Sequence, residues 1–253
     1  MKQIAGHTFL SKLGKKRLRP GGIKATKWLM ARAHIKTGDH LLEVACNMGT
    51  TLIDISKKHD ITAIGIDIDD EALNKARQYA DKLDLSSKLT FTQANATALP
   101  FEDSQFDIII NEAMLTMLND QQKKAALHEY YRVLKKGGIL LTHDVYLRKN
   151  DPTLNKRIKS ELSHTILVPV QPLTKEEWLN LIEQAKFQQT DVVTGPMSLM
   201  KPIGMIRDEG LFNTINIMTN ALKKQHRSRF KSLYHMFKTH DKHIGFIATA
   251  NTK

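Results

Sequence analysis

A short turn rich in small residues lies between an apolar run and a predicted helix near residue 45. Within the segment 41–51, Ala45, Asn47 and Gly49 alternate with larger side chains. Small side chains let the backbone turn sharply and approach a ligand closely. Asp67 ends a second apolar run, and a carboxylate there can accept hydrogen bonds from both hydroxyls of a ribose. Together these features favour an adenosine-containing ligand over the alternative, an ordinary turn with a surface aspartate.

Ionisable side chains also follow two later apolar runs. Glu112 comes after one of them, and His143, Asp144 and Tyr146 come after the next. Any of these side chains could take a proton from a substrate or orient it. We name Glu112 and His143 as candidate catalytic residues. The alternative for His143 is a structural histidine at a strand end.

Short apolar runs predict the strands that must position these residues. Five runs precede residue 146, and two more look like closing strands; they are 40–45, 62–67, 89–92, 106–110, 138–142, 190–193 and 244–250. Runs of this length are typical of strands buried on both faces. Because helical segments alternate with them, we expect right-handed crossovers. The predicted fold class is α/β, a doubly wound, mostly parallel seven-stranded sheet with helices on both faces.

Helix starts and stops are also readable. Asp69-Asp70-Glu71 places acid at the start of a helix that runs to about Leu83. Asn119 or Asp120 starts another, which we expect to end at the Gly137 stop signal. The spacing of Thr174 and Glu177 predicts a capping box. We further predict an N-terminal helix over 24–33, a lid over 147–172 and a helical insert over 203–239.

The net charge of +12 is concentrated at the two ends of the chain. Residues 1–36 hold ten Lys or Arg and no acid, and residues 221–253 hold eight against Asp241 alone. The ends could form a basic rim for an anionic partner, such as a phosphate-bearing metabolite, RNA or a membrane surface. The alternative is solubilising surface on mobile ends.

The composition is that of a soluble globular protein, with 41% hydrophobic and 25% charged residues. The single cysteine, Cys46, excludes an intramolecular disulfide and any cysteine-based zinc site. No apolar run is long enough for a signal peptide or a membrane span. We therefore expect a cytoplasmic protein without a metal site.

From these residues the sequence resembles the class I S-adenosylmethionine (SAM)-dependent methyltransferases. Residues 41–51 resemble the first motif of the family, and residues 94–101 resemble its adenine-binding loop. Residues 106–112 match the fourth strand and its functional tip, and residues 129–138 match the helix and turn before the fifth. This last block is similar to small-molecule members related to the ubiquinone and menaquinone methyltransferases.

The resemblance implies a set of cofactor-binding residues. Glu43 would lie near the methionine end of SAM, and the loop from Ala45 through Asn47 to Gly49 would wrap its methionine and ribose. Asp67 would bind the ribose hydroxyls, and Ile68 would pack on the adenine. Further members of this set, contributed by two later segments, are Asn95, Ala96 and Asn111.

The N-terminal segment 19–26 resembles a segment that closes the cofactor site in some of these enzymes, where Arg19 could pair with the cofactor carboxylate. We accordingly predict a basic N-terminal segment over 1–36 that closes the site, and one methyltransferase domain over 37–253. The sequence departs from the family pattern at Ala45 and Asn47, which replace glycines, and at Asn95, which replaces an aspartate.

Methyl transfer from a sulfonium is an in-line displacement, which requires a donor and an acceptor held in line with water excluded. The sequence predicts that SAM donates a methyl group to a small molecule and that S-adenosylhomocysteine (SAH) is released. Two alternatives stay open: a SAM-binding protein without turnover, suggested by Ala45 and Asn47, and an RNA methyltransferase that uses the basic ends. A nicotinamide dehydrogenase fits residues 94–101 and 132–138 less well. The sequence specifies neither the acceptor nor the oligomeric state.

Overall fold

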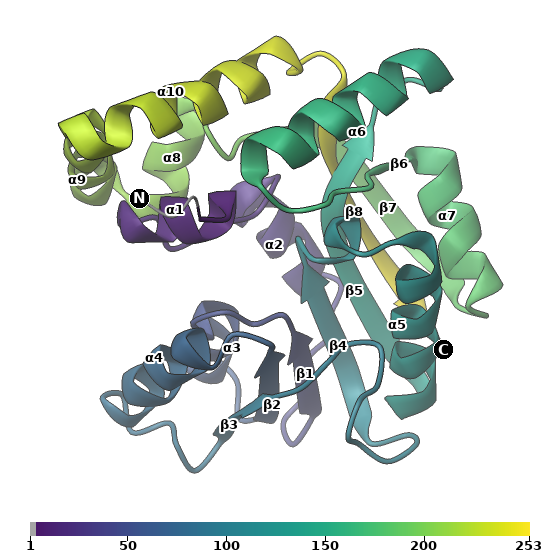
Figure 1. Cartoon of the computed structure of the whole chain (residues 1–253). Coiled ribbons are helices and arrows are strands. Elements are labelled where there is room, and N and C mark those ends of the chain that lie inside the picture. Colours follow the sequence, from purple (N-terminus) through teal and green to yellow (C-terminus); the bar gives the residue numbers. More distant parts are fainter. Residues whose placement is uncertain (1–3) are drawn as a thin grey trace.

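The computed structural model describes residues 4–253, except for the side chains of residues 189 and 190. Its centre is one twisted sheet with strand order β3-β2-β1-β4-β5-β8-β7 (Figure 1). Neighbouring strands pair in parallel from β3 to β5, and β8 is antiparallel to both of its neighbours. The strands of this path are β1 (His40–Val44), β2 (Thr62–Asp67), β3 (Leu89–Gln93), β4 (Phe106–Glu112), β5 (Leu134–Leu147), β7 (Gln188–Pro196) and β8 (Ile244–Thr252).

This sheet confirms the predicted mostly parallel, seven-stranded α/β architecture. Each predicted strand is present, and β2 has the predicted bounds. A further strand of two residues, β6 (Leu173–Thr174), pairs with the end of β5. It is too short to leave an apolar run in the sequence, and we did not predict it.

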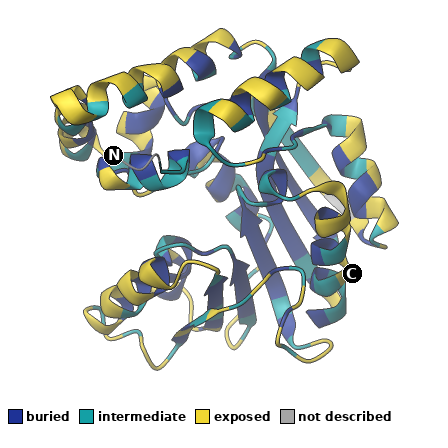
Figure 2. Cartoon of the chain, viewed as in Figure 1, coloured by how far each residue is buried: buried dark blue, intermediate teal, exposed yellow. Residues whose placement is uncertain are grey.

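Helices cover both faces of the sheet because successive strand residues point to opposite sides. Leu41 packs in a cluster with one set of helices, and its neighbour Leu42 packs in a second cluster with the other set. The strands between them are buried (Figure 2). The helices of the first cluster are α2 (Gly22–Met30), α3 (Thr50–Ser56) and α4 (Asp70–Asp81), and those of the second are α5 (Asp120–Val133) and α7 (Lys175–Gln184).

Three of the helices begin where the sequence predicts, and the capping box predicted at Thr174 is present. The side chain of Asp69 accepts hydrogen bonds from two backbone N–H groups of the first turn of α4. Reciprocal capping boxes begin α5 at Asn119 and α7 at Thr174. These side chains satisfy N–H groups that have no partner inside the helix.

The predicted end of α5 at Gly137 is wrong. The helix ends at Val133, and Leu134 is already paired with Phe106 of β4. Gly137 adopts a positive φ of 76° inside β5, where the register with β4 shifts between Phe106 and Ile108. The glycine therefore serves an irregularity within the strand rather than a helix cap, and Lys135 uses its ammonium to bind Asp107 of β4 at 2.8 Å.

The remaining helices gather at the carboxyl ends of the parallel strands (Figure 1). Three of them occupy the predicted helical insert, and one lies within the predicted lid. They pack on one another through two apolar clusters that contain several methionines, among them Met200 and Met236. These helices are α1 (Gly6–Lys12), α6 (Pro152–Ile166), α8 (Pro202–Glu209), α9 (Leu211–Leu222) and α10 (Lys224–Thr239). Across residues 4–253, none of the helices combines the length and the apolar character that crossing a bilayer requires.

The basic N-terminal segment is held to the C-terminal insert by a carboxylate at the end of α8. Glu209 accepts hydrogen bonds from Lys15 Nζ at 3.3 Å and from the backbone N–H of Arg17 at 2.8 Å. It also accepts one from the backbone N–H of Lys16. The side chains of Lys15 and Glu209 are 1% and 0% exposed. Much of the N-terminal segment is thus anchored structure, and only residues 1–3 of it lie outside the description.

We predict that Glu209→Ala lowers the free energy of unfolding by about 3–5 kcal/mol, because it leaves a buried ammonium and two backbone N–H donors without their acceptor. Urea unfolding measures this loss. The control is Glu71→Ala, which removes an exposed partner of Lys75 and should leave the unfolding midpoint unchanged. A loss for Glu209→Ala no larger than that of the control would contradict the role of this contact.

Candidate active site

The tips of β1 and β2 are tied together by Asp67. Its carboxylate accepts a hydrogen bond from the backbone N–H of Asn47 at 2.8 Å and another from that of Asp69 at 3.0 Å. The loop after β1 therefore curls over the end of β2. Two bonds leave further lone pairs on the carboxylate for ligand hydroxyls.

The loop itself contains three small residues, at alternate positions, in left-handed conformation. Ala45, Asn47 and Gly49 have φ values of 59°, 49° and 66°. A side chain at position 49 would place its Cβ 2.5 Å from the ring of Phe91, so glycine is required there by space as well as by backbone angle. The loop thus takes a left-handed shape with only one of its three small positions occupied by glycine. Ala45 bears a conformational cost of about 1–2 kcal/mol.

The side chain of Ile68, next to Asp67 in the chain, projects into solvent, and the residue is 74% exposed. The backbone of Ala94 donates to the carbonyl of Asp67, which places the loop holding Asn95 and Ala96 next to Ile68. The carbonyl oxygen of Asn95 accepts from the backbone N–H and the hydroxyl of Thr97, both at 3.0 Å. This oxygen therefore organises its own turn.

Arg19 reaches the tips of β1 and β4 from the N-terminal segment. Its guanidinium lies 3.0 Å from Glu112 and 3.9 Å from Glu43. It also donates to the hydroxyls of Thr26, at 3.0 Å, and Thr51. The structure thus brings three of the predicted residues into one buried network.

The two carboxylates of this network have different pKa values because they share the cation unequally. Burial raises the pKa of Glu43 to about 7, with Arg19 opposing the shift and Glu112 adding to it. Burial also acts to raise the pKa of Glu112, but Arg19 and the hydrogen bonds from His143 and Thr26 outweigh it and hold that pKa below its usual value. At neutral pH Glu112 is ionised, and Glu43 is near its midpoint.

His143 has both ring nitrogens engaged. Nε2 accepts from the backbone N–H of Gly21 at 2.9 Å, and Nδ1 lies 2.8 Å from the carboxylate of Glu112. The neutral ring therefore carries its proton on Nδ1 and donates it to Glu112. The ring is completely buried. In this structure His143 joins the N-terminal segment to β4 and β5, as in the structural alternative.

An apolar cavity adjoins this network on the side of helices α1 and α6. Its empty volume, mouth included, is about 750 Å³. Two lining residues, Pro20 and Ala113, directly follow Arg19 and Glu112 in the chain. The predicted lid contributes Leu162, Ile166, Val168 and Val170, and the predicted insert contributes Phe237.

The polar side chains of the cavity wall are His7, Thr116 and Asp144. The carboxylate of Asp144 is occupied by the hydroxyl and backbone N–H of Thr116 and by the N–H of Val145. His7 makes no side-chain hydrogen bond to any residue between 4 and 253. Burial lowers its pKa, and the nearby carboxylates of Asp67 and Asp69 oppose that shift. His7 therefore lies between the cavity and the tip of β2.

Sequence reasoning missed His7, because a lone histidine in a basic segment far from the strand tips carries no motif.

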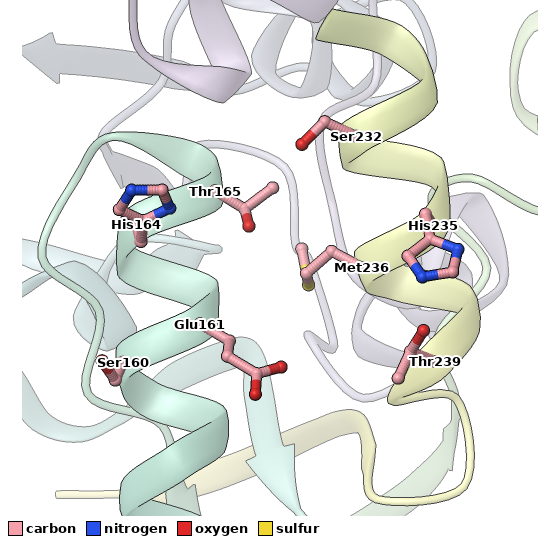
Figure 3. Close-up of a pocket in the computed structure, with 8 residues that line it drawn as sticks. All are labelled: Ser160, Glu161, His164, Thr165, Ser232, His235, Met236 and Thr239. Atoms are coloured by element: carbon pink, nitrogen blue, oxygen red, sulfur yellow. The ribbon is translucent and has the colours of Figure 1, made fainter. Parts of the chain in front are cut away.

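A second hollow, between α6 and α10, is lined mostly by polar side chains (Figure 3). Its wall includes Glu161 and His235, and Glu161 is 2.6 Å from His240. None of its lining residues lies at a strand tip.

Comparison with known proteins places the chain in a family. Residues 41–138 match the family model of a methyltransferase domain. An uncharacterized protein of Haemophilus influenzae is 46% identical over 252 residues, which cover 100% of this chain and 99% of that one. Phosphoethanolamine N-methyltransferase 1 of Arabidopsis thaliana is 30% identical over 124 residues, 49% of this chain but only 24% of that protein.

A solved structure shares the fold. Geranyl diphosphate C-methyltransferase from Streptomyces coelicolor A3(2), solved in complex with Mg²⁺, geranyl diphosphate and SAH, superimposes with a TM-score of 0.66 at 14% identity. The match covers 91% of this chain and 79% of that one. The chain belongs to the class I SAM-dependent methyltransferases, and it shares its whole length with the Haemophilus protein.

Unsatisfied atoms at the strand tips fit the methionine end of SAM. Among residues 4–253, the buried acceptor oxygens Glu43 Oε2 and Asn111 Oδ1 have no hydrogen-bond partner. Asn111 pairs with Val44 in the β1–β4 register, so these acceptors lie at adjacent strand ends. The α-ammonium group of SAM has three donors and a positive charge, and buried acceptors of this kind are costly unless they are paired.

We predict that SAM binding releases a proton at Glu43. A cation bound beside Glu43 favours its charged form, so its pKa falls from about 7 and SAM affinity rises with pH, by at most about tenfold per unit, until Glu43 is ionised in the free protein. Calorimetry between pH 6 and 8, in buffers of different ionisation heat, measures the released proton.

Glu43→Gln should remove this proton release and flatten the pH dependence. The control variant Asp54→Asn changes an exposed carboxylate and should retain both. If proton release persists in Glu43→Gln, the ammonium group does not bind where we place it.

Proposed function

We propose that this protein transfers a methyl group from SAM to a small, largely apolar acceptor bound in the cavity beneath the lid. The observation that carries the proposal is the position of this cavity: its wall includes the residues that directly follow Arg19 and Glu112. An acceptor in the cavity would face a methyl donor held at the tips of β1 and β4. Such an arrangement supplies the alignment and the exclusion of water that displacement at a sulfonium requires.

The chemistry of the wall supports an acceptor that is mainly hydrocarbon. Apart from His7, Thr116 and Asp144, the side chains of the wall are apolar or absent. Thr116 and Asp144 satisfy each other. A strongly hydrated or multiply charged acceptor would lose its water there without regaining hydrogen bonds.

The strand-tip residues have binding and positioning roles in this proposal. Glu43 and Asn111 would accept from the ammonium group of SAM, and Asp67 would bind its ribose, with the adenine against Ile68. Arg19 would bind the SAM carboxylate while it remains paired with Glu112. Glu112 and His143 would then hold Arg19 and Gly21 in place rather than exchange protons with substrate.

We assign the acceptor side to His7. Its imidazole is free of hydrogen bonds to residues 4–253 and faces both the cavity and Asp67. Because burial lowers its pKa, the ring is neutral near pH 7 and can accept a proton from a hydroxyl or ammonium acceptor. A positioned base of this kind contributes about 10²–10⁴-fold to a rate.

A label-transfer experiment tests this proposal. We incubate the protein with methyl-labelled SAM and an organic-solvent extract of bacterial cells, and then partition the label. We expect it in the organic phase with wild-type protein. Val168→Trp, which fills a half-buried position of the cavity wall, should abolish transfer and leave SAM binding unchanged.

The matched controls are two histidine variants in the same assay. His7→Ala should slow transfer by about 10²-fold or more, whereas His164→Ala, at an exposed position of α6, should not. Label recovered in RNA would contradict the small-molecule acceptor. SAM binding without transfer to any fraction would favour a protein that has lost turnover.

A further inference from the structure

Helix α9 presents an apolar stripe to solvent. It contains no charged residue. Leu211, Ile215 and Leu222 are exposed at spacings that place them along one side of a helix. Phe212, adjacent to the stripe, is 88% exposed. The opposite side of α9 packs on the protein through Ile217 and Ala221. The helix therefore has a second, exposed apolar stripe that does not contribute to the core.

Helix α8, which packs against α9, extends this surface with Ile203, 80% exposed, and Ile206. We call these exposed side chains of the two helices the α8–α9 apolar face. Soluble proteins rarely leave adjoining apolar residues of this size in water unless the surface binds a partner.

The charged side chains that residues 201–239 contribute are mostly basic, although Asp241 pairs with Lys201 at the beginning of α8. Between residues 201 and 239 the acids are Asp208 and Glu209, and both side chains are completely buried. Asp208 accepts from the backbone N–H of Ile23, and Glu209 holds Lys15. The acids of the insert are therefore used against the N-terminal segment, and none of them reaches the outer surface.

Exposed lysines from both ends of the chain flank α9. Lys223 and Lys224 follow its last residue and are exposed. Asn213 and Asn220 of α9 donate to the carbonyls of Gly14 and Leu13, which brings the exposed side chains of Lys12 and Lys16 to the same helix. The two basic ends of the sequence thus meet around one apolar stripe.

Two adjoining cavities lie between the beginning of α8 and the strand tips. The cavity proposed for the acceptor shares Met197, Leu199 and Phe237 with a neighbouring cavity. The wall of the neighbour also includes Lys201 and Pro202, where α8 begins. The neighbouring cavity therefore lies between the edge of the α8–α9 apolar face and the cavity proposed for the acceptor.

We propose that the α8–α9 apolar face docks on an anionic lipid bilayer. The apolar side chains would enter the boundary between headgroups and acyl chains, and the flanking lysines would meet the anionic headgroups. A second copy of this chain fits less well. In a two-fold dimer the same patch meets itself, so the lysines around α9 would face their own copies, and like charges would repel.

Vesicle co-sedimentation with the full-length chain tests the proposal. The probes are vesicles of phosphatidylcholine with about one third phosphatidylglycerol, and vesicles of phosphatidylcholine alone. We expect at least about tenfold tighter binding to the anionic vesicles, weakened by salt. Lys223→Gln with Lys224→Gln should reduce binding by about 30-fold, because each cation near an anionic surface contributes about fivefold.

Phe212→Ser should weaken vesicle binding by about tenfold or more. Because Phe212 is 88% exposed, the variant should unfold at the wild-type urea concentration. The control is Tyr79→Ser, which removes an exposed aromatic ring from α4 and should bind vesicles as wild type does.

Equal binding by Phe212→Ser and wild type would overturn the proposal, as would equal binding to both kinds of vesicle. Sedimentation velocity without vesicles measures whether the protein forms a dimer. A wild-type dimer that Phe212→Ser dissociates, with no vesicle binding by either protein, would show that a second copy covers this face.

Discussion

The structure depends on the pairing of Arg19, which is largely withdrawn from solvent, with two buried carboxylates at the carboxyl edge of the sheet. A buried guanidinium is tolerable only with hydrogen bonds and a counter-charge, and Glu112 supplies the closer one at 3.0 Å. This requirement fixes the N-terminal segment over the tips of β1 and β4. It also separates the two carboxylates: Glu112 is ionised, and the pKa of Glu43 is raised to about 7. The site therefore holds an ionised and a titratable carboxylate within one network before any ligand arrives.

The same constraint explains why the basic ends pack against each other. The N-terminal segment must reach the sheet, and its many cations would repel the basic insert. Asp208 and Glu209 are buried and accept hydrogen bonds from the N-terminal segment. The two acids of the insert therefore hold this segment in place. Exposed lysines of both ends are left beside the apolar helix α9. Closure of the cofactor site and the character of the docking surface thus have one electrostatic origin.

Much of the fold was predictable because its signals are local. Alternating apolar runs, the capping boxes at Asn119 and Thr174, and the spacing of Asp67 from Gly49 all lie within short stretches of sequence. Gly137 misled the prediction because a positive-φ glycine ends a helix or bends a strand equally well. The environment of His143 was not predictable, because Gly21, which binds its Nε2, lies 122 residues away. His7 was missed because only the packing of α1 brings it near Asp67.

Hydrogen exchange of the full-length protein, with and without SAH, tests most directly whether the N-terminal segment is part of the cofactor site. If Arg19 binds the carboxylate of the cofactor, SAH should slow exchange in residues 19–26 as well as in the loop 45–49. The N-terminal amides respond because the ligand stabilises the closed arrangement against local opening. Protection confined to the loop and the end of β2, with residues 19–26 exchanging as before, would contradict the account.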